Sequence, residues 1–228
     1  MYRNAEIFNS FTCEWEHADL AVKEGIILGM GPGYRGIAEK DLHGTRLVPG
    51  FIDAHVHIES SLLTPREYAR VVALHGTTTV IADPHEIANV SGARGIRFML
   101  KERAGAPVDI RYMLPTCVPA TPLDTGGAVL GPRALSRFKS HPGILGLGEM
   151  MNVPGVLNGD PEVLEKISLK KICDGHAPLL SGRDLNAYIL AGPDSDHECT
   201  LYSEAGKNSK KVCISSSAKV QQRKTLRR

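Results

Sequence analysis

The chain has 228 residues, of which 42% are apolar and 23% charged, a composition that fits a globular protein and argues against a disordered, collagenous or disulfide-dense chain. No apolar run reaches the ~18 residues needed to span a bilayer, and no apolar leader opens the chain. The five cysteines are odd in number and form no Cys-x-x-Cys pair, so we expect a reduced, cytoplasmic protein without a membrane segment.

Charge is unevenly distributed along the chain, whose formal net charge is +2. Residues 201–228 hold eight Lys and Arg residues and one acid, whereas residues 1–200 hold 19 basic and 24 acidic residues. A basic tail can contact nucleic acid or an anionic membrane, but a solvated chain end is the simpler interpretation. We therefore expect neither partner, and we predict no regular structure for this tail.

Residues 1–48 have the pattern of short strands and turns. Ala18–Val22 and Ile26–Leu28 flank the turn residues Lys23-Glu24-Gly25, which is typical of a hairpin. The glycines between positions 29 and 36 then interrupt any regular element, and their segment follows no βαβ unit, so they do not predict a phosphate loop. We predict strands and no helix in this segment.

From residue 47 onward, apolar strands alternate with helices. We predict strands over residues 47–57, 77–81, 108–114, 143–147, 171–173 and 191–196. We predict helices that begin after Thr64 with a capping box, after Ser91, over 131–138, after Asp160, and after Ser181 with a second capping box. This alternation indicates β/α units around a parallel sheet, whose active site lies at the carboxyl ends of the strands.

The chemistry-bearing residues follow the predicted strands. His55 and His57 lie two apart on the first strand, so both point to one face, although an HxH pair alone is as well explained by surface or packed histidines. Further acids and histidines follow later strands: Asp83, His85, Glu86, Glu149, Asp174, His176, Asp196, His197 and Glu198. Chance placement at so many strand ends is less plausible than a shared metal site.

Imidazoles with a carboxylate suit Zn, Mn or Fe rather than Ca or Mg. Such a site lowers the pKa of bound water to about 7, which indicates hydrolysis at an electrophilic carbon. A nucleophilic serine or cysteine is less well supported, because no Gly-x-Ser-x-Gly motif occurs and no cysteine has a matched histidine.

Five motifs of the chain resemble those of the amidohydrolase superfamily and, more narrowly, of its adenine deaminases. The motifs are Val48–His57 with Ile58-Glu59-Ser60-Ser61, Ala82–Asn89, Gly148–Asn152, Asp174–Pro178 and Ser195–Glu198. The resemblance covers roughly residues 18 to 200 and implies an incomplete (β/α)8 TIM-type barrel of about six β/α units. The implied domains are a partial β-sandwich over 1–48, a partial barrel over 49–200 and the basic tail, disordered or out of frame, over 201–228.

The resemblance also implies a reaction, the deamination of adenine to hypoxanthine and ammonia in purine catabolism. His55 and His57 would hold one divalent metal, His176 and His197 a second, and Glu149 would bridge them in a binuclear Mn, Fe or Zn centre. Asp83, His85 and Glu86 would bind the substrate. Glu149 and Glu86 would be the catalytic residues, with Glu86 a candidate for moving a proton. The partner is the small-molecule substrate, and the resemblance allows a homodimer.

The chain departs from the family pattern after residue 200, where a barrel of about 250 residues would continue. The last two strands, with the strand-eight aspartate, are expected to be absent, so we interpret the sequence as truncated or frameshifted and expect a poor catalyst. The alternatives are another cyclic-amide hydrolase of the dihydroorotase or dihydropyrimidinase type, whose usual lysine at position 149 counts against it, or an inactive remnant with a basic binding tail.

Overall fold

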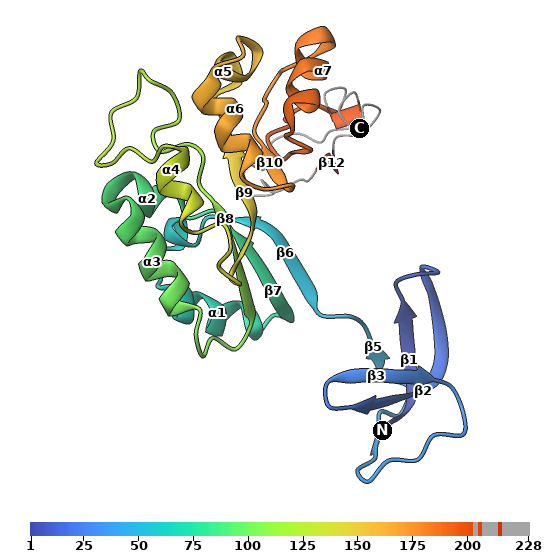
Figure 1. The fold of residues 1–228 in the computed structure, drawn as a ribbon. Coiled ribbons are helices and arrows are strands. Elements are labelled where there is room, and N and C mark those ends of the chain that lie inside the picture. Colours follow the sequence, from blue (N-terminus) through green and yellow to red (C-terminus); the bar gives the residue numbers. More distant parts are fainter. Residues whose placement is uncertain (203–204, 207–213, 216–228) are drawn as a thin grey trace. The chain divides into compact units, whose positions relative to one another are not determined.

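A computed structural model describes residues 1–202, 205–206 and 214–215 (Figure 1). The chain divides into two compact units, Met1–Phe51 and a second that begins at Ile52. Each unit has its own cluster of buried apolar side chains. The second unit carries all the residues predicted for the metal site, and the first is described only briefly.

The first unit is one mixed sheet with strands in the order β3-β2-β1-β4, and with β5 also paired to β1. Its strands are β1 (Tyr2–Asn9), β2 (Glu14–Lys23), β3 (Ile26–Met30), β4 (Lys40–Asp41) and β5 (Arg46–Leu47). The predicted hairpin is confirmed, since β2 and β3 pair antiparallel with Lys23 opposite Ile26. Glu24 and Gly25, the two turn residues, both have positive φ, as a tight hairpin turn requires. The predicted absence of helix holds for this unit.

The second unit is built on a five-stranded sheet in the order β10-β9-β8-β7-β6. The strands are β6 (Phe51–Val56), β7 (Thr77–Ala82), β8 (Asp109–Leu114), β9 (Ile144–Met150) and β10 (Cys173–Gly175). The pairs β7–β8, β8–β9 and β9–β10 are parallel. The order follows the sequence without a reversal, which is the arrangement of consecutive strands in a β/α barrel. An incomplete barrel, as predicted, describes this unit.

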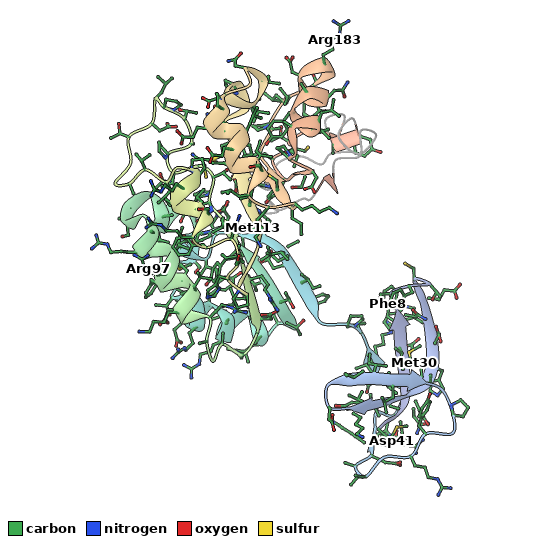
Figure 2. All side chains as sticks on the ribbon, viewed as in Figure 1. Phe8, Met30, Asp41, Arg97, Met113 and Arg183 are labelled. Atoms are coloured by element: carbon green, nitrogen blue, oxygen red, sulfur yellow. The ribbon has the colours of Figure 1, made fainter. Side chains whose placement is uncertain are left out.

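Helices connect these strands. They are η1 (Ile58–Ser61, a 3-10 turn), α1 (Pro65–Ala73), α2 (His85–Ser91), α3 (Ala93–Glu102), α4 (Pro132–Ser136), α5 (Val153–Leu157), α6 (Pro161–Ser168) and α7 (Gly182–Ala191). Buried residues of α3 such as Ile96 and Met99 join the core, while Arg97 points outward (Figure 2). The same division places Met113 of β8 inside and Arg183 of α7 on the surface.

The helix starts predicted after Thr64, Asp160 and Ser181 are confirmed in position, but only one of the three caps makes the expected hydrogen bonds. Asp160 caps α6 through its side chain, which accepts hydrogen bonds from the backbone N–H groups of Glu162 and Val163. Thr64 and Ser181 occupy the N-cap positions of α1 and α7, yet neither side chain makes a cap hydrogen bond. The two capping boxes were therefore wrong as hydrogen-bond predictions.

Ser91 was predicted to cap a helix and is instead the last residue of α2. Gly92, with φ of 56°, separates α2 from α3 in a conformation that glycine adopts at low cost. The prediction missed α2 itself because its seven residues follow Asp83-Pro84 and were interpreted only as a polar strand end. The short helix α5 was missed as well.

The sixth predicted strand is present as β11 (Ser195–Asp196), beside β10, with the backbone N–H of Asp194 donating to the carbonyl of Cys173. β11 pairs in parallel with β12 (Ile214–Ser215), a strand that the sequence did not predict in the basic tail. Most of the tail for which no regular structure was predicted lies outside the described residues. All eight Lys and Arg residues of the tail also lie outside them. No described helix combines the length and the apolar character needed to cross a membrane.

Candidate metal centre

The histidines predicted to bind metal meet at the carboxyl ends of the strands. His55 lies in β6 and His57 directly after it, His176 follows β10, and His197 follows β11. Glu149 is near the end of β9, with 1% of its surface exposed. Because β9 and β10 run in parallel, their carboxyl ends share one edge of the sheet. His55 and His197 meet Glu149 there, although they lie 142 positions apart in the sequence.

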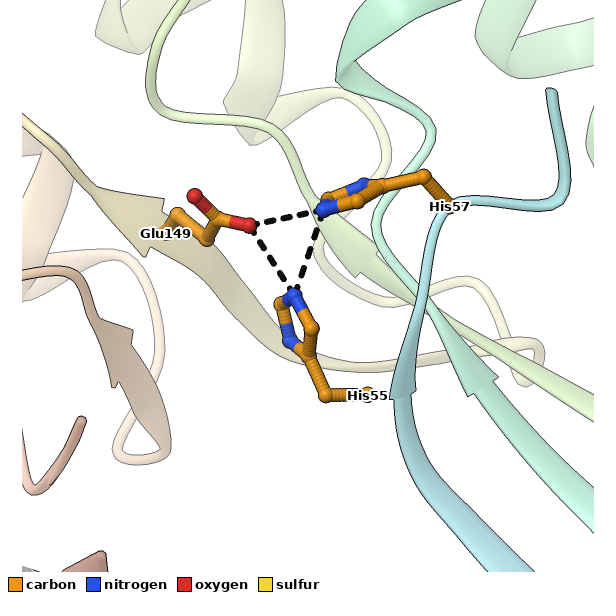
Figure 3. A group of neighbouring side chains, drawn as sticks. All are labelled: His55, His57 and Glu149. Carbon is orange, nitrogen blue, oxygen red and sulfur yellow. Dashed lines mark hydrogen bonds and ion pairs between the residues drawn. The ribbon is translucent and has the colours of Figure 1, made fainter. Parts of the chain in front are cut away.

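Four imidazoles converge on the Glu149 carboxylate. The Nε2 atoms of His55 and His57 both lie 2.9 Å from Oε1. Figure 3 shows the two rings pointing toward the same carboxylate oxygen. The Nε2 atom of His197 is 3.3 Å from the same oxygen, and the Nδ1 atom of His176 is 2.8 Å from Oε2. Each carboxylate oxygen therefore faces ring nitrogens, and the four rings surround a single buried charge.

The hydrogen bonds of the Nδ1 atoms of His55 and His57 determine which ring nitrogen carries the proton. His55 Nδ1 lies 2.7 Å from Asp174 Oδ2, and His57 Nδ1 lies 3.0 Å from the backbone oxygen of Asp83. Both partners are acceptors, so each Nδ1 carries the proton and donates it. In the neutral rings, both Nε2 lone pairs then point at Glu149 Oε1 and lie 3.3 Å from each other. A cation between them would turn this repulsion into attraction, so the donor set fits a divalent metal ion.

The donor set divides into two overlapping groups. His55, His57 and Glu149 form one, and Glu149, His176 and His197 form the other, with the ligand atoms of each group within 4.8 Å of one another. Imidazole nitrogen and carboxylate oxygen are the ligands of Zn, Mn and Fe sites rather than of Ca sites. The shared carboxylate places Glu149 where a ligand to two neighbouring ions would stand.

Charge pairing shifts the pKa values of this cluster. Burial lowers the pKa of His55, but the hydrogen bonds that its doubly protonated ring, the state without a metal, donates to Asp174 and Glu149 outweigh this effect and raise the pKa to about 9. The pKa values of His57 and His197 are also raised to about 9, against the effect of burial. Burial raises the pKa of the Glu149 carboxyl, but the surrounding histidines hold it well below its usual range. Glu149 is thus ionised, as a candidate metal ligand must be.

Asp83 accepts hydrogen bonds from two residues of the candidate centre. It has no exposed surface, its Oδ2 accepts the Glu149 backbone N–H at 2.8 Å, and its own carbonyl accepts the His57 Nδ1–H. Its carboxyl also lies so close to Gly148 that a Cβ on that residue would come within 2.1 Å of Oδ2. Asp83 therefore contacts two residues of the candidate centre through its backbone oxygen and Oδ2, while Oδ1 has no hydrogen-bond partner among the described residues.

His85 stands at the rim of the cluster. Its ring lies 4.4 Å from the His57 ring, centroid to centroid, and its Nδ1 is 3.5 Å from Asp83 Oδ2. Burial lowers the pKa of His85, but the contact with Asp83 outweighs it, so the pKa is raised. The structure brings this predicted residue to the site.

Glu86 is half-buried on α2, and its side chain accepts a hydrogen bond from the Ser60 hydroxyl at 2.7 Å. No contact between Glu86 and the four histidines is found among the described residues. It lies one residue from His85, on the element that begins at the rim of the site.

Sequence reasoning assigned no role to Asp174 and Ser195, although both lie in the motifs that carried the resemblance. Asp174 accepts the His55 Nδ1–H, and the Ser195 hydroxyl donates to Asp174 Oδ1. The available signal was the position of Asp174 at a strand end, two residues before His176. It does not show that the carboxylate turns toward a histidine 119 residues away.

Comparison with known proteins agrees with this geometry. The family model described as the amidohydrolase family matches residues 46–224. Curated relatives include the adenine deaminase of Methanoregula boonei, 68% identical over 203 residues, that of Methanoculleus marisnigri, 63% over 187, and adenine deaminase 2 of Carboxydothermus hydrogenoformans, 54% over 205. These matches cover 82% to 89% of the chain, which spans 36% of the length of each relative.

A solved structure supports the fold. The crystal structure of D-hydantoinase from Bacillus sp. AR9 matches 94% of this chain and 55% of its own with a TM-score of 0.63, at 16% sequence identity. Its likeness concerns the fold alone. The family model covers most of the second unit, including every ligand of the candidate centre. The chain belongs to the amidohydrolase family.

Proposed function

We propose that this chain carries the metal centre of a hydrolase that deaminates adenine to hypoxanthine and ammonia. The observation that carries the hydrolytic chemistry is the convergence of four imidazoles on one buried, ionised carboxylate. The relatives named adenine deaminase, with up to 68% identity over most of this chain, support adenine as the substrate.

In this proposal His55 and His57 hold one divalent ion, His176 and His197 hold a second, and Glu149 bridges them. Mn, Fe and Zn all suit these ligands. Such ions, when bound, lower the pKa of water and so supply a nucleophile at neutral pH. The Asp83 carbonyl and the Asp174 carboxylate keep the Nδ1 atoms of His57 and His55 protonated, which leaves their Nε2 atoms free to act as ligands.

The reaction adds the oxygen of water to C6 of the purine and breaks the C6–N bond to the exocyclic amine. One proton of the water ends on the leaving amine, which departs as ammonia, and the other on ring N1. His85 and Glu86 are the groups that we propose to bind the purine and to move a proton, because His85 lies at the rim of the cluster and Glu86 beside it. Asp83, fully buried, takes part by fixing Glu149 and His57.

The test is adenine turnover by the purified 228-residue chain after loading with Mn, Fe or Zn. Hypoxanthine is measured by chromatography and ammonia by a coupled assay, and the ion content is measured on the same sample. We expect equal amounts of both products, formed only with metal present. Dihydrouracil and hydantoin serve as the matched cyclic-amide substrates, and we expect neither to be opened.

Opening of either cyclic amide without adenine turnover would replace the proposal with a cyclic-amide hydrolase. Failure of the chain to bind any of the three metals would remove its chemical basis. A variant with His176→Asn and His197→Asn provides the negative control, because it removes the ligands of one proposed ion while retaining polar side chains of lower metal affinity.

A further inference from the structure

Asp174 occupies the middle of β10 (Cys173–Gly175), two residues before His176, and its side chain is 12% exposed. Its Oδ2 accepts the Nδ1–H of His55 at 2.7 Å. Its Oδ1 accepts the Ser195 hydroxyl and, at 3.0 Å, the backbone N–H of Gly175. Both oxygens are thus fixed, and the carboxylate cannot turn without losing a hydrogen bond.

The same carboxylate faces a second histidine. The rings of His55 and His197 are stacked, with their centroids 3.7 Å apart and their planes at 24°. His197 Nδ1 is buried, has no hydrogen-bond partner among the described residues, and lies 3.8 Å from Asp174 Oδ1. The Nδ1 sides of both rings therefore face Asp174, while both Nε2 atoms face Glu149 Oε1, at 2.9 and 3.3 Å.

We propose that Asp174 is a positioning residue shared by the two metal ions, because it orients His55 of one ion position and His197 of the other. This inference rests on the proposed function and its two-ion centre. An ionised carboxylate only accepts hydrogen bonds, so each Nδ1 that faces it keeps its proton and each Nε2 keeps the lone pair that binds metal. The negative charge behind the rings also makes both imidazoles better donors to a cation.

The surroundings of Asp174 favour the ionised form. Its oxygens accept from the His55 Nδ1–H, the Ser195 hydroxyl and the Gly175 backbone N–H, and a carboxylate that meets only donors is suited to the ionised state. Ser195 lies two residues before His197, so the segment that carries one ligand also supplies the hydroxyl that holds Asp174. This link ties β10 and β11 to the histidine from β6.

Asp174→Asn is the direct test. An amide can offer its oxygen to only one of the two sides, so its NH₂ group must face either the His55 Nδ1–H or the donors Ser195 and Gly175. We expect each of the two ions to bind roughly 10- to 100-fold more weakly. Stepwise affinities are measured on the full chain by competition with a chromophoric chelator, for Zn and Mn in turn. Asp194→Asn is the control, since it removes an exposed carboxylate just before Ser195.

A purely structural role predicts a lower melting temperature of the metal-free protein with unchanged metal affinity, so the melting temperature is measured on every variant. In Zn-loaded protein, ¹H–¹⁵N spectra of the histidine rings report the Nδ1–H protons. We expect the hydrogen-bonded Nδ1–H signal of His55 and the Nδ1–H signal of His197, which faces the same carboxylate, to shift in Asp174→Asn alone. If that variant fails to fold, Ser195→Ala decides, with an expected loss of several-fold in both affinities.

Two outcomes contradict the shared role specifically. In one, Asp174→Asn and Ser195→Ala bind both ions as the parent chain does. In the other, only one of the two affinities falls. Either result leaves the proposed function standing, because the parent chain still binds its ions. Failure of the parent chain itself to bind metal would overturn the proposed function and this inference together.

Discussion

Glu149 is the residue around which the four histidines gather. It supplies the only carboxylate that contacts every one of them in the described part of the chain. In Glu149→Gln the volume is retained but the charge is lost, and the amide NH₂ is no metal ligand. We expect metal content to fall from near stoichiometric to near zero, measured by elemental analysis after gel filtration.

The matched control for this change is Glu165→Gln, which removes the charge of an exposed glutamate on α6. It should load metal as the parent chain does. Full metal stoichiometry in Glu149→Gln would contradict the assignment of Glu149 as the bridging ligand.

Gly148 is a glycine because the Asp83 carboxyl occupies the place of a side chain. A Cβ at this position would lie 2.1 Å from Oδ2, far inside contact distance. Gly148→Ala must therefore push Asp83 away from the Glu149 backbone N–H that it accepts. We expect a loss of about 1–3 kcal/mol in the free energy of unfolding, together with weaker metal binding, measured by denaturant titration and chelator competition.

Gly131→Ala is the comparison for this variant, since its Cβ would meet the nearest atom, Glu162 Oε1, at an ordinary 3.5 Å. Gly131 is the N-cap of α4, where alanine is less favourable than glycine, so we expect a loss of about 0.5–1 kcal/mol in stability with unchanged metal affinity. Equal effects of the two substitutions would mean that the Asp83 carboxyl moves away without cost and does not hold Glu149 in place.

Much of the candidate centre was predictable at this scale, because an apolar strand followed by a histidine or an acid places that side chain at the strand's carboxyl end. The five expected ligands lie together for this reason. The role of Asp174 and the orientation of Asp83 were not predictable. Both depend on which neighbour a side chain turns toward across the sheet, and sequence spacing carries no information about that.

At the scale of single elements, the helix starts show which local hydrogen bonds contribute to stability. Asp160 accepts two backbone N–H groups at the start of α6, whereas the Thr64 side chain makes no cap hydrogen bond at the start of α1. We expect Asp160→Ala to cost about 1 kcal/mol of stability and Thr64→Ala distinctly less, measured by thermal and urea unfolding. A larger loss for Thr64→Ala would contradict the described cap geometry.

The same comparison explains which elements the sequence could predict. Strands and long amphipathic helices are visible because their apolar residues recur with a fixed period, as in α3, where Ile96, Met99 and Leu100 are buried. Helices α2 and α5 have seven and five residues, too few for a period to stand out. Their start and end depend on Pro84, Gly92 and Asn152 and on contacts that only the folded chain provides.

At the scale of the whole second unit, the described residues supply a full set of candidate metal ligands but only part of a barrel around them. The histidines and Glu149 come from β6, β9 and the ends of β10 and β11, so the ligand set is assembled within one run of neighbouring strands. The parallel sheet described here ends at β6 on one side and at β10 on the other, and Ile52 in β6 is 63% exposed. A closed barrel has no such edges, so the ions can be held while the substrate stays partly exposed to solvent.

This difference predicts that metal binding and turnover are separable in the 228-residue chain. We expect the chain to load its ions, because the described residues supply the four imidazoles and the carboxylate that they share. We expect adenine turnover well below the roughly 10 s⁻¹ that is typical of enzymes, because a partly open site neither orients the purine tightly nor excludes water around the developing charge. Initial rates of hypoxanthine formation and the ion content, measured on the same fractions, test both statements. A metal-loaded chain that deaminates adenine at an ordinary enzymatic rate would show that the open edges of the sheet leave the reacting position intact, and that the residues described here suffice for catalysis as well as for metal binding.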